Sequence, residues 1–507
     1  MREKEQQKKS GNRVWNGIER FGNSLPHPVY IFMILTVVVI IVSALCSSIE
    51  FPHPNTGEVQ HITNLLSKDG LIWLLNSMVE NFVTFSPLGV TLVSMLGIGI
   101  AEETGLVRTV IQSSIAGAPR ALVTGIVLLV GIMGSLAGSA TFVIIPPLGA
   151  MIFKGMGRHP IAGLATGFAG VAAGLSANLM ITQTDILVSG ITESAAQIFD
   201  PNYTVNPTVN WYFMAASTVV LTIVGTFVVD KIIEPRLGVY TGNVDETEEE
   251  TITAVTEQEK AGMRWALFAV LGFLVLVALT IIPKNGLLRG ENGEIINSPF
   301  MSAMVPILTL FFLVAGLGYG IRTKKIRKSA DIIQMWTKSM SGLTGFVVLC
   351  FFAGQFVKAF SQSNLGLYLS VQGSEFLSKS KLTGAPLIIC FIGITMLINF
   401  VIGSASAKWA LMAPIFVPMF MKLNFSPAFT QAAFRIADSV TNAISPLEPF
   451  MPFIIMTALK YDKKSGLGTI IATMLPLVIS FAVAWVLLLL VWFGFNLPLG
   501  PGSTIFM

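Results

Sequence analysis

Long apolar runs follow one another along most of this 507-residue chain and are separated by short polar stretches. A run of about 20 apolar residues is long enough for a helix to cross the hydrocarbon core of a bilayer. Runs of this kind, some of them interrupted, lie at 29–48, 84–101, 121–137, 161–179, 210–230, 264–283, 300–320, 343–360, 384–402, 428–445 and 466–495. The pattern predicts an all-α, polytopic membrane protein.

Two of these stretches are broken by small polar residues, with the sequences GSLAGSAT at 134–141 and NFVIGSASAKW at 399–409. Each break precedes an apolar run that contains two prolines. Irregular backbone at membrane depth is tolerated only where protein or a water-filled cavity surrounds it. We therefore predict two re-entrant helical hairpins, near 138–158 and 403–423. Paired breaks in two halves of a chain are typical of the binding site of a secondary transporter.

The two halves correspond weakly to each other. A serine at each tip is followed at a similar distance by an asparagine, and the pairs are Ser139 with Asn178 and Ser404 with Asn442. Each asparagine is expected in a helix opened by a proline, Pro160 or Pro427. This correspondence predicts an inverted repeat.

Charged residues are scarce, and their distribution predicts the orientation of the chain in the membrane. Only 12% of the residues are charged, and the net charge is +4. Basic residues cluster in the first 20 residues, at 322–328 and at 460–464, whereas the stretch 50–71 holds only Lys68. The positive-inside rule then places the N-terminus in the cytoplasm. The expected parts are a cytoplasmic N-terminus (1–28), a first half (29–230), a cytoplasmic linker (231–263) and a second half (264–507).

Polar residues inside the predicted spans are the candidates for the site, because ionisable groups at membrane depth are costly and usually face a cavity or a partner. Their spacing of four, three and four residues predicts one helix face in each half. The residues of the second half are Gln431, Arg435, Asp438 and Asn442, and those of the first half are Asn178, Thr182, Asp185 and Ser189.

Each candidate also has a structural interpretation. Arg435 and Asp438 could be an ion pair within one helix, or a substrate site in which the guanidinium binds a carboxylate or sulfonyl group. Asp185 could cap a helix or bind a cation or proton. Trp409 could stack on an aromatic ligand or anchor at the interface, and Lys408 could snorkel to the interface or neutralise Asp438.

The proline-flanked Glu448 is a second-tier candidate, because the backbone there is expected to be broken. Hard oxygen ligands suit Na⁺, so the tips and asparagines predict two cation sites with Na⁺ as the coupling ion. Their residues are Gly138, Ser139 and Asn178 in one, and Gly403, Ser404 and Asn442 in the other. A proton-coupled carrier would instead use Asp185 or Asp438.

Several motifs resemble the AbgT family of bacterial inner-membrane transporters, and the resemblance covers essentially the whole chain. The motifs are PHP at 26–28, NWYFM at 210–214, DKIIEPRLG at 230–238, APIFVPMFM at 413–421 and FRIADS at 434–439. The resemblance implies a homodimer with about nine transmembrane helices and two re-entrant hairpins. It also implies either uptake of p-aminobenzoyl-glutamate or export of sulfonamide antimetabolites, driven by an ion or proton gradient.

Matched by motif, the substrate-path residues of that family fall on Asp185, Ser406, Trp409, Pro427, Arg435, Asp438 and Pro446. The chain departs from the p-aminobenzoyl-glutamate importer at two places. Its first tip, 137–140, lacks an acidic residue, and Asn442 replaces an apolar residue. Both departures resemble sodium-coupled members of the wider ion-transporter superfamily.

Other functions are less consistent with the sequence. A sodium-coupled carrier of another small carboxylate is the main alternative. An ion channel would favour a symmetric filter, and an enzyme would require a reactive motif such as HExxH or GxSxG, which the chain lacks. No P-loop motif indicates ATP as the energy source. We expect no enzymatic activity, no cofactor apart from a coupling Na⁺, and no nucleic-acid partner.

Overall fold

The computed structural model describes residues 28–52, 58–116, 119, 122–137, 140–240, 255–290, 293–295, 298–380, 383–445 and 448–507. These residues are almost entirely helical, with one antiparallel pair of short strands, β1 (Glu50–Pro52) and β2 (Val59–His61). The predicted all-α class is confirmed.

The helices of the first half are α2 (Pro28–Leu45), α3 (Lys68–Asn76), α4 (Met78–Val83), α5 (Ser86–Glu103), α6 (Leu106–Ala116), α7 (Val123–Ile132), η2 (Met133–Ala137), α8 (Ala140–Gly155), α9 (Pro160–Phe168), η3 (Ala169–Ala173), α10 (Gln183–Ala196), α11 (Trp211–Val228), η4 (Val229–Ile233) and α12 (Glu234–Leu237).

The helices of the second half are α13 (Glu257–Ile281), α14 (Pro299–Ser302), α15 (Met304–Arg322), α16 (Ser329–Ser341), α17 (Thr344–Gln362), α18 (Leu365–Lys379), α19 (Gly384–Asn399), α20 (Ala405–Lys422), α21 (Pro427–Val440), η6 (Thr441–Ile444), α22 (Met451–Leu459) and α23 (Leu467–Phe495).

Five of the described helices are long and apolar enough to cross a membrane. They are Trp211–Leu237, Glu257–Ile281, Met304–Arg322, Thr344–Gln362 and Leu467–Phe495. A sixth span results if α5 and the start of α6, which meet at 59°, are counted as one. Shorter apolar helices, among them those of the two predicted hairpins, make up the rest, so the expected number of about nine spans stays a prediction.

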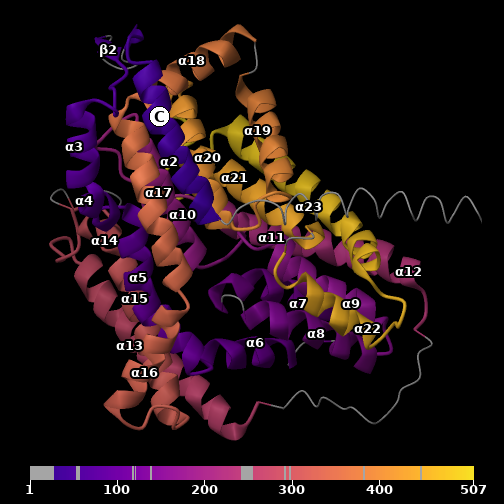
Figure 1. The fold of residues 1–507 in the computed structure, drawn as a ribbon. Helices are drawn as coiled ribbons and strands as arrows, with labels where there is room; N and C mark the ends of the chain where they lie inside the picture. The colour runs from indigo at the N-terminus through magenta and orange to yellow at the C-terminus, as the bar shows by residue number, and fades with distance from the viewer. Residues whose placement is uncertain are drawn as a thin grey trace, which may run out of the picture.

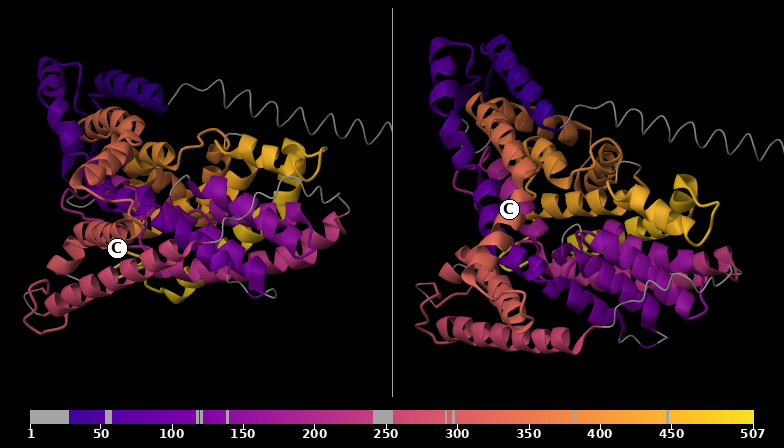
Figure 2. Two further views of the ribbon diagram at one scale, coloured as in Figure 1. Left: turned by 90° about the horizontal axis from the view of Figure 1, so that it is seen from below. Right: turned by 60° about the horizontal axis from the view of Figure 1, so that its bottom comes forward.

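Helices α5, α13, α15 and α16 pack together on one side of the molecule (Figure 1). Gly97 and Gly316 bring α5 and α15 into backbone contact, because an added Cβ would overlap Thr309 or Ala101. Small residues at such positions are the usual way in which membrane helices approach closely. Helices α7 to α9, α22 and α23 lie on the other side, and Figure 2 shows the same separation from two further directions.

Each predicted hairpin begins earlier in the chain than expected. Segments 138–158 and 403–423 each contain one continuous helix, α8 or α20, in spite of their internal prolines. The chain reverses just before these helices. In the first half a Cβ on Gly134 would contact Thr141, and one on Gly149 would contact Val127, so α7–η2 and α8 run antiparallel. The first hairpin is therefore 123–155, and its tip residues Gly138 and Ser139 lie outside the described residues.

The second hairpin has the same construction and consists of α19 and α20. The ring of Phe391 lies 5.0 Å from that of Phe416 and 5.2 Å from that of Phe420, which places the two helices side by side. Residues 400–404 form its tip, so this hairpin spans 384–422. The same order of elements, a hairpin followed by a proline-opened helix, thus occurs in both halves, as the repeat predicts.

The helix after each hairpin is interrupted. In the first half, α9 and the π-helical turn η3 end before an irregular stretch, and a new helix, α10, begins at Gln183. The prediction that Asn178, Thr182, Asp185 and Ser189 share one helix face is therefore wrong, since Asn178 and Thr182 precede α10. Likewise α21 and η6 end before α22, which confirms the expected break near Glu448.

The last residues of the sequence close over the start of α21. The backbone N–H of Ser426 donates to the carbonyl of Ile505 (2.8 Å), and the Ser426 hydroxyl donates to that of Thr504 (2.5 Å). The ring of Phe506 stacks on that of Phe425. This contact, the C-terminal clasp, fixes the turn that leads into α21.

Candidate functional site

The predicted polar residues meet where α10, α20 and α21 pack against one another, near the middle of the molecule (Figure 1). Helix α21 is buried along its whole length, although it carries Gln431, Arg435 and Asp438. Burial of such groups is stable only when each has a partner, so their contacts define the site.

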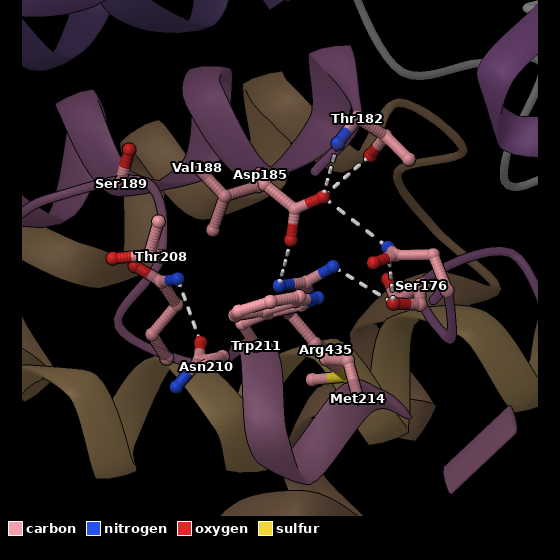
Figure 3. Close-up of polar contacts among 12 residues, drawn as sticks. Ser176, Thr182, Asp185, Val188, Ser189, Thr208, Asn210, Trp211, Met214 and Arg435 are labelled. Carbon is pink, nitrogen blue, oxygen red and sulfur yellow. Dashed lines mark hydrogen bonds and ion pairs between the residues drawn. The ribbon is translucent and has the colours of Figure 1, made fainter. Parts of the chain in front are cut away.

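The guanidinium of Arg435 binds Asp185, a residue of the other half of the chain (Figure 3). Its Nη1 donates to Asp185 Oδ1 at 2.7 Å, and its Nη2 donates to the carbonyl of Ser176 at 2.8 Å. Both side chains are 1% exposed. The ion pair therefore connects the two halves across the break that precedes α10.

The second carboxylate oxygen of Asp185 organises the start of α10. It accepts hydrogen bonds from the backbone N–H of Thr182 (2.7 Å), the Thr182 hydroxyl (2.6 Å) and Asn178 Nδ2 (3.2 Å). An acidic residue three positions after a threonine is typical of a helix start. Asp185 is thus the third residue of α10 and not its N-cap, which is Thr182, and its binding of a cation or proton stays a prediction.

Asp438 pairs with Lys408, and the prediction of an ion pair between Arg435 and Asp438 within one helix is wrong. Lys408 Nζ lies 2.5 Å from Asp438 Oδ1 and also donates to Asn399 Oδ1. The side chains of Lys408 and Asp438 are 0% and 3% exposed. The expectation that Lys408 neutralises Asp438 is confirmed.

Two buried polar atoms of this cluster have no hydrogen-bond partner among the described residues. They are Arg435 Nε and Asn178 Oδ1. Each such atom costs free energy when buried, so unpaired atoms of this kind commonly mark places where polar groups are bound. One donor and one acceptor are therefore left beside the Asp185–Arg435 pair.

Trp409 belongs to a third set of contacts on the same three helices. Its ring stacks on Phe434 with centroids 4.3 Å apart, and its indole N–H donates to the hydroxyl of Thr192 at 2.8 Å. That hydroxyl donates to Gln431 Oε1 at 2.6 Å, and Gln431 Nε2 donates to Asn210 Oδ1 at 2.7 Å. Trp409 is fully buried, so it is not an interfacial anchor.

The other predicted substrate residues have local roles or lie outside the described residues. Pro427 is the first residue of α21, next to the capping Ser426. Ser406 is half-buried in the first turn of α20, 3.2 Å from the hydroxyl of Ser404. Pro446 lies outside the described residues, and Glu448 is 9% exposed in the break before α22.

The two predicted cation sites stay predictions, and the structure describes only part of the first one. Asn178 is buried, but its partners Gly138 and Ser139 lie outside the described part of the chain. In the second site Gly403 and Ser404 are exposed, and the Ser404 hydroxyl caps α20 by accepting from the N–H of Ala407. Asn442 is instead bound by Asn399, whose Nδ2 donates to its Oδ1 at 2.8 Å.

Sequence reasoning missed Thr192, Asn210 and Asn399. Asn399 directly precedes the second tip, and its position at the end of an apolar run was a usable signal. Asn210 lies in a motif already noted at 210–214. Nothing in the local sequence distinguishes Thr192 from the many helix threonines that bond their own backbone.

Comparison with known proteins shows to which family the chain belongs. Residues 13–507 match the AbgT putative transporter family. The chain is 41% identical to the p-aminobenzoyl-glutamate transport protein of Escherichia coli (strain K12), over 97% of this chain and 96% of the relative.

Two solved structures are similar over nearly the whole chain. The MtrF protein of Neisseria gonorrhoeae, described among a class of antimetabolite efflux pumps, has a TM-score of 0.92 at 42% identity and covers 97% of this chain and 100% of its own. The YdaH transporter of Alcanivorax borkumensis has a TM-score of 0.89 at 36% identity, and the match covers 94% of this chain and 100% of the YdaH chain. This chain is a multi-pass membrane protein and belongs to the AbgT putative transporter family.

Proposed function

We propose that the protein is a secondary active transporter, driven by a Na⁺ or H⁺ gradient, that moves aromatic anions of the p-aminobenzoyl-glutamate type or exports sulfonamide antimetabolites. It acts as a homodimer in the bacterial inner membrane, with a cytoplasmic N-terminus, and it catalyses no covalent reaction. The observation that supports this most is the fully buried Asp185–Arg435 pair at the junction of the two halves.

The chemistry of the cluster suits an aromatic anion. Arg435 presents a planar fork of donors that binds a carboxylate or sulfonyl group in two places. An entering carboxylate would replace Asp185 as the partner of Arg435. The stacked pair Trp409 and Phe434, adjacent in sequence to the charged residues, offers aromatic faces for the ring.

Charge balance explains the need for a gradient. Asp185, Arg435, Lys408 and Asp438 form two pairs with no net charge. An anion that enters this buried cluster leaves one carboxylate without a counter-ion, and such a charge is strongly destabilised at low dielectric. A co-transported Na⁺ or H⁺ removes that cost. The similarity to the E. coli relative supports p-aminobenzoyl-glutamate as a substrate, and the similarity to MtrF supports sulfonamide export.

Counterflow in proteoliposomes tests this function. We expect the purified protein, preloaded with unlabelled p-aminobenzoyl-glutamate, to accumulate the labelled compound transiently. Arg435→Met combined with Asp185→Asn, which leaves no lone buried charge, should abolish this, because the charge-assisted bonds to the anion are lost. Lys463→Met, at an exposed loop position, is the control and should keep wild-type counterflow. If neither p-aminobenzoyl-glutamate nor a sulfonamide shows counterflow, the proposed substrates are wrong.

A further inference from the structure

Arg435 and Lys408 occupy equivalent positions in the cluster. Each is fully buried, each binds one carboxylate, and each has a second contact with an uncharged oxygen: the Ser176 carbonyl for Arg435 and the Asn399 amide for Lys408. Lys408 is a hydrogen-bond donor only, so a carboxylate is the natural competitor for Asp438.

Each of the two cations is next in sequence to one ring of an aromatic pair. Lys408 adjoins Trp409 on α20, Arg435 adjoins Phe434 on α21, and the rings of Trp409 and Phe434 stack at 4.3 Å. The three helices therefore carry two buried cations, each paired with one carboxylate, and a stacked aromatic pair adjacent to them in sequence. A monocarboxylate uses only one of these cations, whereas a dicarboxylate attached to an aromatic ring can use both.

We propose that Lys408 is a specificity-determining residue, whose ammonium group leaves Asp438 to bind the second carboxylate of an aromatic dicarboxylate. This inference rests on the proposed function. The released Asp438 carboxylate then needs a cation of its own, just as Asp185 does when Arg435 binds the first carboxylate. The site consequently takes up one coupling cation for each carboxylate of the substrate.

Three probes that differ in the number of carboxylates test this role: p-aminobenzoyl-glutamate with two, p-aminobenzoate with one and sulfanilamide with none. Equilibrium binding to the purified protein and counterflow are measured for each. In Lys408→Met we expect the affinity ratio of the dicarboxylate to the monocarboxylate to fall about tenfold or more, because one charge-assisted contact is lost. Lys408→Arg keeps the charge and should restore most of the ratio.

Two further variants keep the test sharp. Lys422→Met, at the other end of α20, should keep the wild-type ratio. If Lys408→Met does not fold because Asp438 is left as a lone charge, Lys408→Met with Asp438→Asn replaces it and should show the same fall. An unchanged ratio in a folded variant overturns the role of Lys408.

Stoichiometry gives an independent measurement on the wild-type protein. For each substrate, the cation gradient at which net flux stops gives the number of cations transported per substrate molecule. We expect this number to be larger by one for p-aminobenzoyl-glutamate than for p-aminobenzoate. Equal stoichiometry would contradict the exchange at Lys408 even if transport is normal. Absence of binding and counterflow with all three probes would instead refute the proposed function, so the two failures are distinguishable.

Discussion

At the scale of single residues, Asp185 shows how one carboxylate can serve both fold and site. One oxygen binds the start of α10, while the other binds Arg435. The sequence revealed Asp185, Arg435 and Asp438 because charges are rare in apolar segments. It did not reveal which acidic residue binds Arg435. Asp185 is 250 residues away in the sequence, whereas Asp438 is close to Arg435 on the same helix and was the obvious partner.

The observed pairing predicts which double substitutions are tolerated. Asp185→Asn with Arg435→Met removes both charges of one pair but keeps an acceptor oxygen for Thr182, and should leave a folded protein that does not transport. Arg435→Met with Asp438→Leu removes half of each pair, and leaves Asp185 and Lys408 as buried lone charges. Each lone charge should cost about 3–5 kcal/mol, so this variant should be much less stable.

Thermal unfolding in detergent, read together with the yield of folded protein, measures the difference. Lys463→Met serves again as the exposed control. Equal stability of the two double variants would show that the pairs of the structure are not those that stabilise the protein.

At the scale of elements, the sequence located the second tip, between Asn399 and Ala405, but misjudged the arms of both hairpins. The prolines of α8 and α20 suggested chain reversal, yet both helices continue through them, because neighbouring helices and polar groups accommodate such breaks inside a membrane protein. The apolar runs that precede the tips, first interpreted as separate spans, form the other arm of each hairpin. Periodicity cannot distinguish a short crossing helix from half a hairpin.

Close packing within the first half gives a prediction at this scale. Gly149 of α8 and Gly163 of α9 face each other, and an added Cβ on either would overlap the carbonyl of the other. Gly149→Ala and Gly163→Ala should therefore each destabilise the protein by about 1–3 kcal/mol, as overpacking does. Gly155→Ala, on the same helix with nothing within 4 Å of the new Cβ, should have no such effect.

Thermal melting of the three alanine variants checks this expectation, and the transport rate shows whether the contact of α8 with α9 also matters during the cycle. A Gly163→Ala protein as stable as Gly155→Ala would mean that the two helices are not in contact in the membrane.

At the scale of the whole molecule, the repeated order of elements predicts opposite entry of the two hairpins. In Figure 1, α19 and α20 lie above the buried α10 and α21, whereas α7 and α8 lie below them. The fold class and family could be predicted from hydropathy and motifs, because these are distributed along the entire chain. The number of spans could not, since several helices of the described part are too short to cross alone.

Single cysteines at Ser139 and Ser404 test this arrangement in a background without Cys46, Cys350 and Cys390. Ser404 is exposed at its tip. We expect membrane-impermeant thiol reagents to modify the two positions from opposite faces of sealed vesicles. Modification of both from the same face would be incompatible with an inverted repeat.

The C-terminal clasp has a consequence for biosynthesis. The Ser426 hydroxyl that introduces α21 is bonded to Thr504, a residue that the ribosome adds 78 positions later. Helices α22 and α23 must be made, and α23 inserted, before that contact can form. The helix that carries Arg435 and Asp438 is thus fixed in place only after Thr504 has been added, when Arg435 and Lys408 already have Asp185 and Asp438 available as partners.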